Sequence, residues 1–102
     1  MSTLQQIHRD EAGVTYRDRS GTITTGGTAQ ELAPASPSRD HMPIGNPNAT
    51  GSLWVNDYGG TAAANGAGST EIAPGQTVQT RSRNAISIVG ATTGMKFSAG
   101  EA

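Results

Sequence analysis

The side chains that could act as acid–base groups or metal ligands are few and fall in two places. His8 is followed closely by Asp10 and Glu11, and Asp40 directly precedes His41. A zinc site needs three or four converging ligands, mostly histidine and cysteine. The chain has two histidines and no cysteine. We therefore interpret both groupings as exposed polar residues and predict neither a metal site nor a cofactor.

Motifs for nucleophilic catalysis and phosphate binding are also missing from the sequence. Asp40 and His41 next to a serine would supply the parts of a catalytic triad, but no serine lies in the G-x-S-x-G turn that exposes such a nucleophile. The glycine pairs at 26–27 and 59–60 lack the Gly-Lys-Ser/Thr that completes a phosphate loop. A thin core leaves little room for a pocket holding a general acid or base. The sequence predicts that the protein is not an enzyme.

Composition indicates a small domain with a weak core. Of its 102 residues, 33% are hydrophobic, 4% are aromatic and 14 are glycine. An ordinary globular domain has roughly 45–50% apolar residues, glycine included. Small domains of this kind usually depend on disulfides, a metal or oligomerisation. The absence of cysteine removes disulfides and most zinc sites, so we expect oligomerisation.

Charge and hydropathy exclude two classes of partner. The net charge is -1 and the seven lysines and arginines are scattered, which argues against a nucleic-acid partner. No apolar run approaches the length of a membrane span. The first residues have neither the basic start nor the apolar block of a secretion signal. We expect a protein kept in a cytosol-like compartment, or carried outward within an assembly.

Residues 1–20 differ from the rest of the chain by their density of charge. Leu4 and Ile7 can share one face of a short helix, and Val14 and Tyr16 alternate as in a brief strand. A helix of fewer than a dozen residues is marginal on its own. We interpret residues 1–20 as an extended N-terminal arm that orders by docking on another surface. A partly disordered terminus is the alternative.

Short strand-like segments separated by glycine and proline follow the arm. They cover residues 22–25, 28–33, 41–45, 51–58, 70–73, 76–80, 84–90 and 95–97. Their spacing predicts an all-β fold, a small antiparallel β-sandwich or barrel of jelly-roll type. We assign residues 21–99 to this domain and residues 100–102 to a frayed C-terminus.

Three of these segments carry further expectations. One helical turn would also suit residues 28–33. Pro43 has no amide hydrogen, so we place it at a sheet edge or just before regular pairing begins. Pro74 and Gly75 fit the centre of a type II turn, with residues 76–80 as the returning strand. The predicted core consists of Ile23, Leu32, Ile44, Leu53, Val55, Ile72, Val78, Ile86, Ile88, Met95 and Phe97.

The segment 51–58 is the densest apolar run in the middle of the chain and contains the only tryptophan. Leu53 and Val55 would face one side of a strand and Trp54 the other. If Leu53 and Val55 face the core, the indole needs cover from a loop or a second subunit. Trp54 and Tyr58 could also form a carbohydrate-binding platform, although a lone tryptophan in a strand more often has a structural role.

Arg81 and Arg83 flank Ser82 between two predicted strands. They could pair with acidic groups of a partner, and a solvated hairpin loop is the alternative.

A series of short motifs follows in a fixed order between residues 22 and 99. They are Thr24–Gln30, Arg39, Ile44-Gly45-Asn46, Leu53-Trp54-Val55-Asn56, Gly59-Gly60-Thr61-Ala62, Ile72-Ala73-Pro74-Gly75, and Ala85–Gly94 with Phe97. Each is weak alone, but in this order they resemble small β-sandwich virion proteins of tailed bacteriophages, of the head decoration (cement) type. Residues 1–20 lie outside the resemblance.

The resemblance implies a structural protein on the outer surface of the capsid, without catalytic residues. Its partners would be the major capsid protein and further copies of itself, in a homodimer or homotrimer. Such a protein bridges capsid subunits and so stabilises the assembled head. The residues we predict at the oligomer or capsid interface are Leu4, Ile7, Val14, Tyr16, Trp54, Tyr58, Arg81 and Arg83. A tail, spike or fibre-anchoring component is the alternative. A carbohydrate-binding module, resting on Trp54 and Tyr58, is the alternative of another class.

Overall fold

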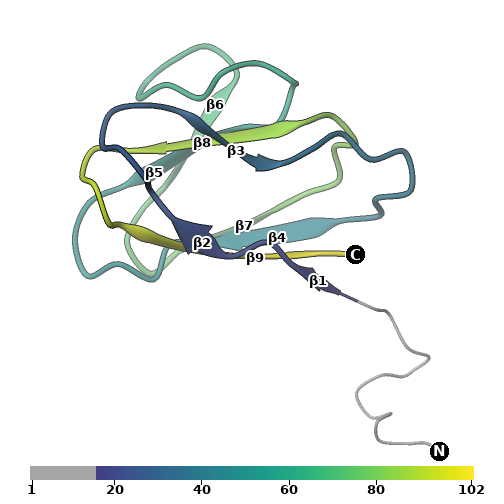
Figure 1. Ribbon diagram of the computed structural model, residues 1–102, viewed down its shortest axis with the longest axis horizontal. Coiled ribbons are helices and arrows are strands. Elements are labelled where there is room, and N and C mark those ends of the chain that lie inside the picture. Colours follow the sequence, from purple (N-terminus) through teal and green to yellow (C-terminus); the bar gives the residue numbers. More distant parts are fainter. Residues whose placement is uncertain (1–15) are drawn as a thin grey trace, which may run out of the picture.

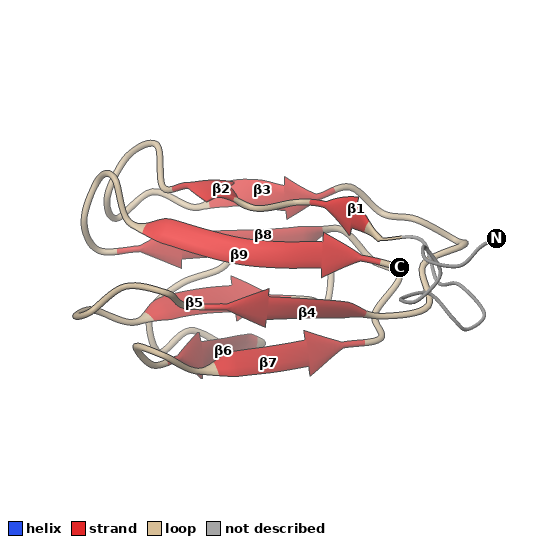
Figure 2. Cartoon of the chain, turned by 90° about the horizontal axis from the view of Figure 1, so that it is seen from below, coloured by secondary structure: helices blue, strands red, loops and turns tan. Residues whose placement is uncertain are grey.

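A computed structural model describes residues 16–102. This part of the chain forms two antiparallel β-sheets packed face to face, as Figures 1 and 2 show. The strands are β1 (Arg17–Asp18), β2 (Gly21–Thr22), β3 (Gln30–Ala33), β4 (Met42–Gly45), β5 (Leu53–Asn56), β6 (Ser69–Ile72), β7 (Thr77–Thr80), β8 (Ile86–Gly90) and β9 (Lys96–Glu101). The predicted all-β sandwich is confirmed, and residues 28–33 contain a strand rather than a helical turn. Within residues 16–102, no helix is long and apolar enough to cross a membrane.

One sheet has the order β1-β9-β4-β7, with β2 also paired to β9. The other has the order β3-β8-β5-β6. Only the β5–β6 connection joins neighbouring strands of one sheet as a hairpin. Nearly every other connection crosses from one sheet to the other, so the two layers are interwoven (Figure 1).

The core lies between the sheets and follows the alternation of the strands. Leu53 and Val55 on β5 are buried, as are Ile86 and Ile88 on β8. Ten of the eleven predicted core residues are buried, and Val78 is partly buried against them. The buried cluster also includes Ala33, Met42 and Ala99, which the sequence analysis missed. The small side chains of Ala33 and Ala99 let the two sheets approach closely there, and Met42 fills part of the space between them.

The strand β4 lies inside its sheet, between β9 and β7, so an edge position for Pro43 is wrong. The ladder with β7 runs unbroken from Met42 to Gly45, whereas the ladder with β9 covers only Ile44 and Gly45. Two residues before the proline, His41 exchanges two backbone hydrogen bonds with Ala102, of 2.9 and 3.3 Å. In a β-strand, residues two apart direct their amides to the same neighbouring strand, so the amide position of Pro43, like that of His41, faces β9. The missing amide hydrogen of Pro43 therefore interrupts pairing with β9 alone, and regular pairing with β9 starts just after it.

The turn at Pro74 and Gly75 has the expected geometry but a different role. Gly75 has φ = 80°, and the Gln76 amide donates to the Ala73 carbonyl at 2.9 Å. The strands on either side belong to different sheets, because β6 pairs with β5 and β7 pairs with β4. The turn is thus an arch over the edge of the sandwich, and the predicted strand that follows it, β7, lies in the other sheet.

Both ends of the domain extend beyond the predicted limits. The strand β9 continues to Glu101, which is 8% exposed, so residues 100–102 are not frayed. Arg17 and Asp18 pair with Glu101 and Gly100, so the last residues assigned to the arm belong to the sheet. The sequence around Glu101 has no apolar alternation that would predict a strand. Pairing on both edges of β9 and the ion pairs of Glu101 hold this end of the chain in place.

Candidate functional site

The outer face of the β3-β8-β5-β6 sheet has an apolar groove around Trp54. Trp54 lies opposite Val89 in the β5–β8 register, and both side chains point away from the core. The groove has a volume of about 360 Å³ and is lined chiefly by these two residues and the alanines 62–64. Trp54 is partly buried in it. An indole in an open apolar groove supplies a large contact area for a second surface.

The loop between β5 and β6 forms one wall of this groove. Its Ala62 amide donates to the Ser87 hydroxyl at 2.9 Å, and Ala62 is 4% exposed. Because the loop lies over the sheet, Val89 is 7% exposed although it faces away from the core. The glycine-alanine loop therefore covers part of the outer face and leaves Trp54 only partly covered.

Asn56, at the end of β5, holds this loop in place. Its Oδ1 atom accepts hydrogen bonds from the amides of Tyr58 at 2.9 Å and Gly60 at 3.2 Å. A Cβ atom at Gly60 or Gly68 would lie 3.0 Å from Asn56 Nδ2, which explains the glycines on both sides of the loop. Tyr58 is 76% exposed and does not line the groove. The two aromatic residues therefore do not form one binding platform.

At one end of the sandwich, Arg39 is buried and joins three parts of the chain. Its Nε donates to Glu101 Oε2 at 2.8 Å. Its terminal nitrogens donate to the carbonyls of Ser82 at 2.7 Å, Asn84 at 2.8 Å and Pro34 at 2.6 Å. The residue is 1% exposed. A guanidinium group meets this set of acceptors because its five N–H donors are held in one plane.

Glu101 links this arginine to Arg19, which directly follows β1. Its second oxygen, Oε1, accepts a hydrogen bond from Arg19 Nε at 2.9 Å. Burial alone would raise the pKa of Glu101, but the hydrogen bonds and charges of Arg39 and Arg19 outweigh it and lower the pKa below its usual value. From the sequence, Arg39 was noted only as part of a motif and Glu101 was not predicted, because neither residue has an apolar or charge pattern around it.

Tyr16, a predicted interface residue, contacts the loop before β4. Its hydroxyl lies 2.8 Å from His41 Nε2, and the two rings meet edge to face with their centroids 5.6 Å apart. His41 Nδ1 lies 2.8 Å from Asp40 Oδ2, and this hydrogen bond is the main cause of the lowered pKa of Asp40. In the described residues His41 therefore pairs with a tyrosine and an aspartate and with no serine. Tyr16 remains 53% exposed.

The two arginines of the β7–β8 connection differ in role. Arg81 has an exposed side chain, 3.9 Å from Asp40 Oδ1. Arg83 Nε donates to the Arg39 carbonyl at 2.9 Å, and the Arg83 carbonyl accepts a bond from the Ser36 amide at 3.0 Å. Arg83 thus stabilises the loop that presents Arg39, while Arg81 is available to a partner.

The remaining predicted interface residues, Leu4, Ile7 and Val14, lie outside the described residues. So do His8 and the two acidic residues near it. Among residues 16–102, no group of three or more histidine, cysteine, aspartate or glutamate side chains is placed to hold a metal ion.

The comparisons with known proteins bear on the fold. No protein-family model matches the sequence, and no curated protein sequence matches it either. Among solved structures, the chain is similar to the stem and receptor-binding domain of the spike protein from bacteriophage PM2, with a TM-score of 0.52 and 19% identity. The match covers 83% of this chain and 33% of that chain, so this chain spans about a third of its structural neighbour. At this level of identity the similarity shows a common fold.

Proposed function

We propose that this protein is a structural component of a bacteriophage virion, and that it acts as a decoration protein on the capsid. The fold shared with a domain of a phage spike protein supports a virion role, as does the order of motifs along residues 22–99. The protein would form a homodimer or homotrimer and bridge subunits of the major capsid protein on the outer surface of the head.

The groove around Trp54 is the observation that carries this proposal. It is an apolar area on the outer face of a sheet, and the protein's own loop covers it only in part. Burial of apolar surface contributes about 25 cal/mol per Å², so a partner that covers the indole gains binding energy without disturbing the core. Repetition of this contact by symmetry around a shell would stabilise the assembly.

Replacement of Trp54 by alanine tests the interface role. Because Trp54 lies outside the core, Trp54→Ala should keep the fold and lower the free energy of unfolding by only about 1 kcal/mol, well below the 3–5 kcal/mol of a buried aromatic. The same change should weaken self-association or capsid binding at least about tenfold, since large aromatic residues dominate interface energies. Sedimentation and circular dichroism measure the two effects.

Gln79→Ala on β7 is the control, because Gln79 is exposed on the other sheet. It should change neither association nor stability. A Trp54→Ala variant that unfolds, or that associates like the wild type, would contradict an interface at the groove.

A spike or fibre-anchoring component is the second candidate, because the structural neighbour is itself a spike protein. The two roles differ in copy number. Quantitative mass spectrometry of particles that carry the protein should find hundreds of copies for a decoration protein. Tens of copies or fewer would favour the spike role instead.

A further inference from the structure

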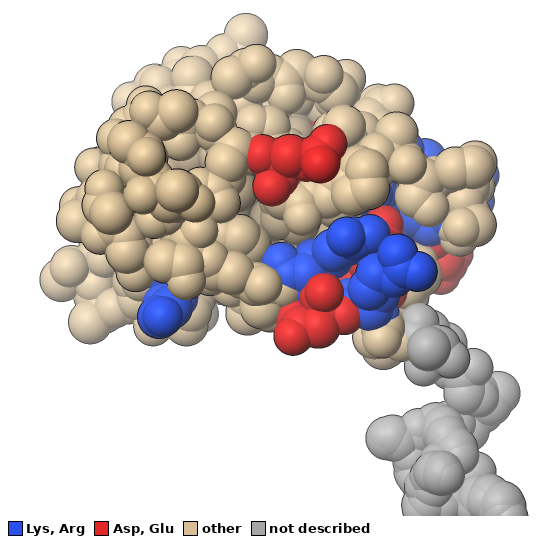
Figure 3. All heavy atoms as spheres, in the orientation of Figure 1, with Lys and Arg blue, Asp and Glu red and all other residues tan. Residues whose placement is uncertain are grey.

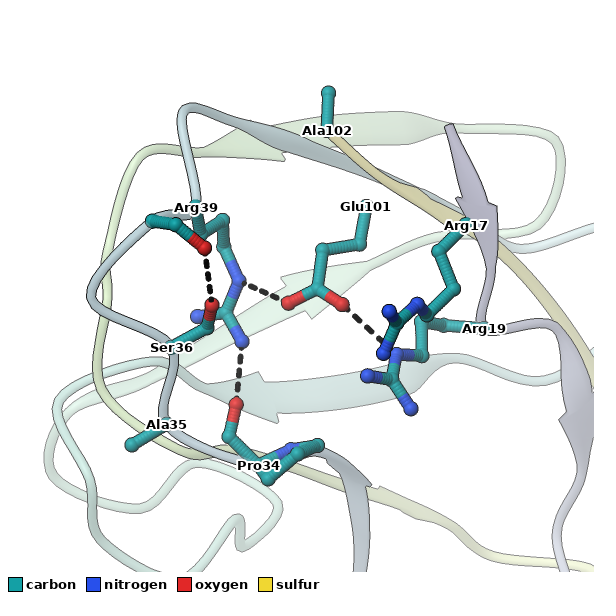
Figure 4. A pocket seen from close by; sticks show the side chains of 9 residues that line it. Arg17, Arg19, Pro34, Ala35, Ser36, Arg39, Glu101 and Ala102 are labelled. Atoms are coloured by element: carbon teal, nitrogen blue, oxygen red, sulfur yellow. Dashed lines mark hydrogen bonds and ion pairs between the residues drawn. The ribbon is translucent and has the colours of Figure 1, made fainter. Parts of the chain in front are cut away.

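The end of the sandwich beside β1 contains a second cavity, of about 340 Å³, shown in Figure 4. Arg17 and Arg19 line one side of it, and Ser36 and Ser38 of the loop before β4 also line it. The ion pair of Arg39 and Glu101 lies between the two walls. Guanidinium and hydroxyl groups are hydrogen-bond donors, so the cavity is rich in donors.

The lining side chains carry an excess of positive charge. Three arginines and one glutamate line the cavity. Each carboxylate oxygen of Glu101 already accepts a hydrogen bond, Oε1 from Arg19 and Oε2 from Arg39. Figure 3 shows Lys and Arg atoms gathered at this end of the molecule, with Asp and Glu atoms beside them. The single negative charge of Glu101 therefore does not balance the three arginines that line the cavity.

Arg17 lines the cavity without an acidic partner in the described chain. It stands directly opposite Glu101 in the β1–β9 register, yet within residues 16–102 its side chain forms no hydrogen bond or ion pair. The neighbouring acid, Asp18, accepts a hydrogen bond from the Ser20 amide at 2.9 Å and does not line the cavity. No acidic side chain of the described chain therefore balances Arg17.

Arg19 also has donors to spare. Its Nε is bound to Glu101, but its two terminal nitrogens have no hydrogen-bond partner within residues 16–102. Figure 4 shows the Arg17 and Arg19 side chains next to each other on the same side of Glu101. Two adjacent cations repel each other, and an anion between them removes this repulsion.

We propose that this cavity binds an oxyanion, the carboxylate or phosphate group of a ligand, between Arg17 and Arg19. Guanidinium groups bind both kinds of anion through paired hydrogen bonds. The Ser36 and Ser38 hydroxyls line the same cavity and can supply further donors. Its volume is within the range of small-ligand pockets, about 300–1,000 Å³. The proposal does not depend on the virion role.

The test is a titration of the full chain followed by NMR, with inorganic phosphate in one arm and succinate in the other. Sodium chloride at the same ionic strength is the reference. We expect saturable shifts of the Arg17 and Arg19 side-chain N–H signals and of the Ser36 amide. Tighter binding of phosphate would assign a phosphate-bearing ligand, and tighter binding of succinate a carboxylate.

Arg17→Gln should weaken anion binding by about tenfold or more, because hydrogen bonds to charged groups are worth that factor. Its fold should be unchanged, since Arg17 is exposed and its side chain bonds to nothing in the described chain. Arg81→Gln removes an exposed arginine outside the cavity and should bind like the wild type. Shifts that do not saturate, that chloride reproduces, or that survive unchanged in Arg17→Gln would overturn the proposal.

Discussion

Removal of the buried arginine is the sharpest test of what holds this sandwich closed. Arg39 is 1% exposed and joins the β3–β4 loop, the β7–β8 connection and β9. Arg39→Met keeps the apolar stem of the side chain but removes its four hydrogen bonds. Glu101 then keeps only Arg19 as a partner, and the three carbonyls lose their donor.

The expected cost follows from these contacts. Breaking a buried ion pair by removing one partner costs about 3–5 kcal/mol. Residues 16–102, at about 0.05–0.15 kcal/mol per residue, have a total stability of about 4–13 kcal/mol. Arg39→Met should therefore remove roughly a quarter or more of the free energy of unfolding.

Two further variants separate the contributions. Arg39→Lys keeps the charge near Glu101 but lacks the planar fork that reaches three carbonyls, so it should fall between wild type and Arg39→Met. Glu101→Gln leaves the carbonyl bonds intact and should cost about 1–3 kcal/mol. Combined with Arg39→Met, it should cost less than the sum of the two, because the residues interact directly.

Urea unfolding followed by circular dichroism measures all four variants. An Arg39→Met cost below about 1 kcal/mol would refute the idea that a buried charge network closes this end, since that is the range of an exposed ion pair. Strict additivity with Glu101→Gln would refute the coupling.

Acid and a single glycine provide two more tests. The pKa of Glu101 is lower when folded than its ordinary value of 4.5, so its ion pairs stabilise the protein above that pH and are lost as the pH falls through the folded pKa. The melting temperature should drop on acidification below about pH 4.5, and less so in Glu101→Gln. Gly26→Ala would bring a Cβ to 2.5 Å from the Ala91 carbonyl oxygen, in a turn of fixed backbone, and should cost about 1–3 kcal/mol in a urea titration. The exposed neighbour Thr25→Ala should have no such effect, and equal midpoints for the two variants would contradict the clash.

Alternation along single strands could be predicted from the sequence. Leu53 and Val55 face the core and Trp54 faces outward, as the period of two requires. The choice between a loop and a second subunit as cover for Trp54 was left open by the sequence, and the β5–β6 loop supplies part of that cover.

The pairing of strands could not be predicted. The alternation of apolar residues along a strand shows which of its faces is buried, but not which strand lies beside it. The segments around Pro74 and Gly75 have the sequence of a hairpin, yet they enter different sheets. The site at the end of the sandwich was missed for a related reason. Arg39 and Glu101 meet only through the fold, across 62 residues of chain, and a charged residue in a polar segment gives no local sign that it will be buried.

The position of β9 has a consequence for synthesis of the protein. This strand pairs with β1 and β2 on one edge and with β4 on the other, so it connects residues 17–22 to residues 96–101. Contacts between segments so distant in sequence form slowly, because the intervening chain must be ordered first. On the ribosome, the edge of β4 stays unpaired until residue 101 has left the exit tunnel. Until then the nascent chain exposes an open strand edge, the kind of surface on which aggregation begins.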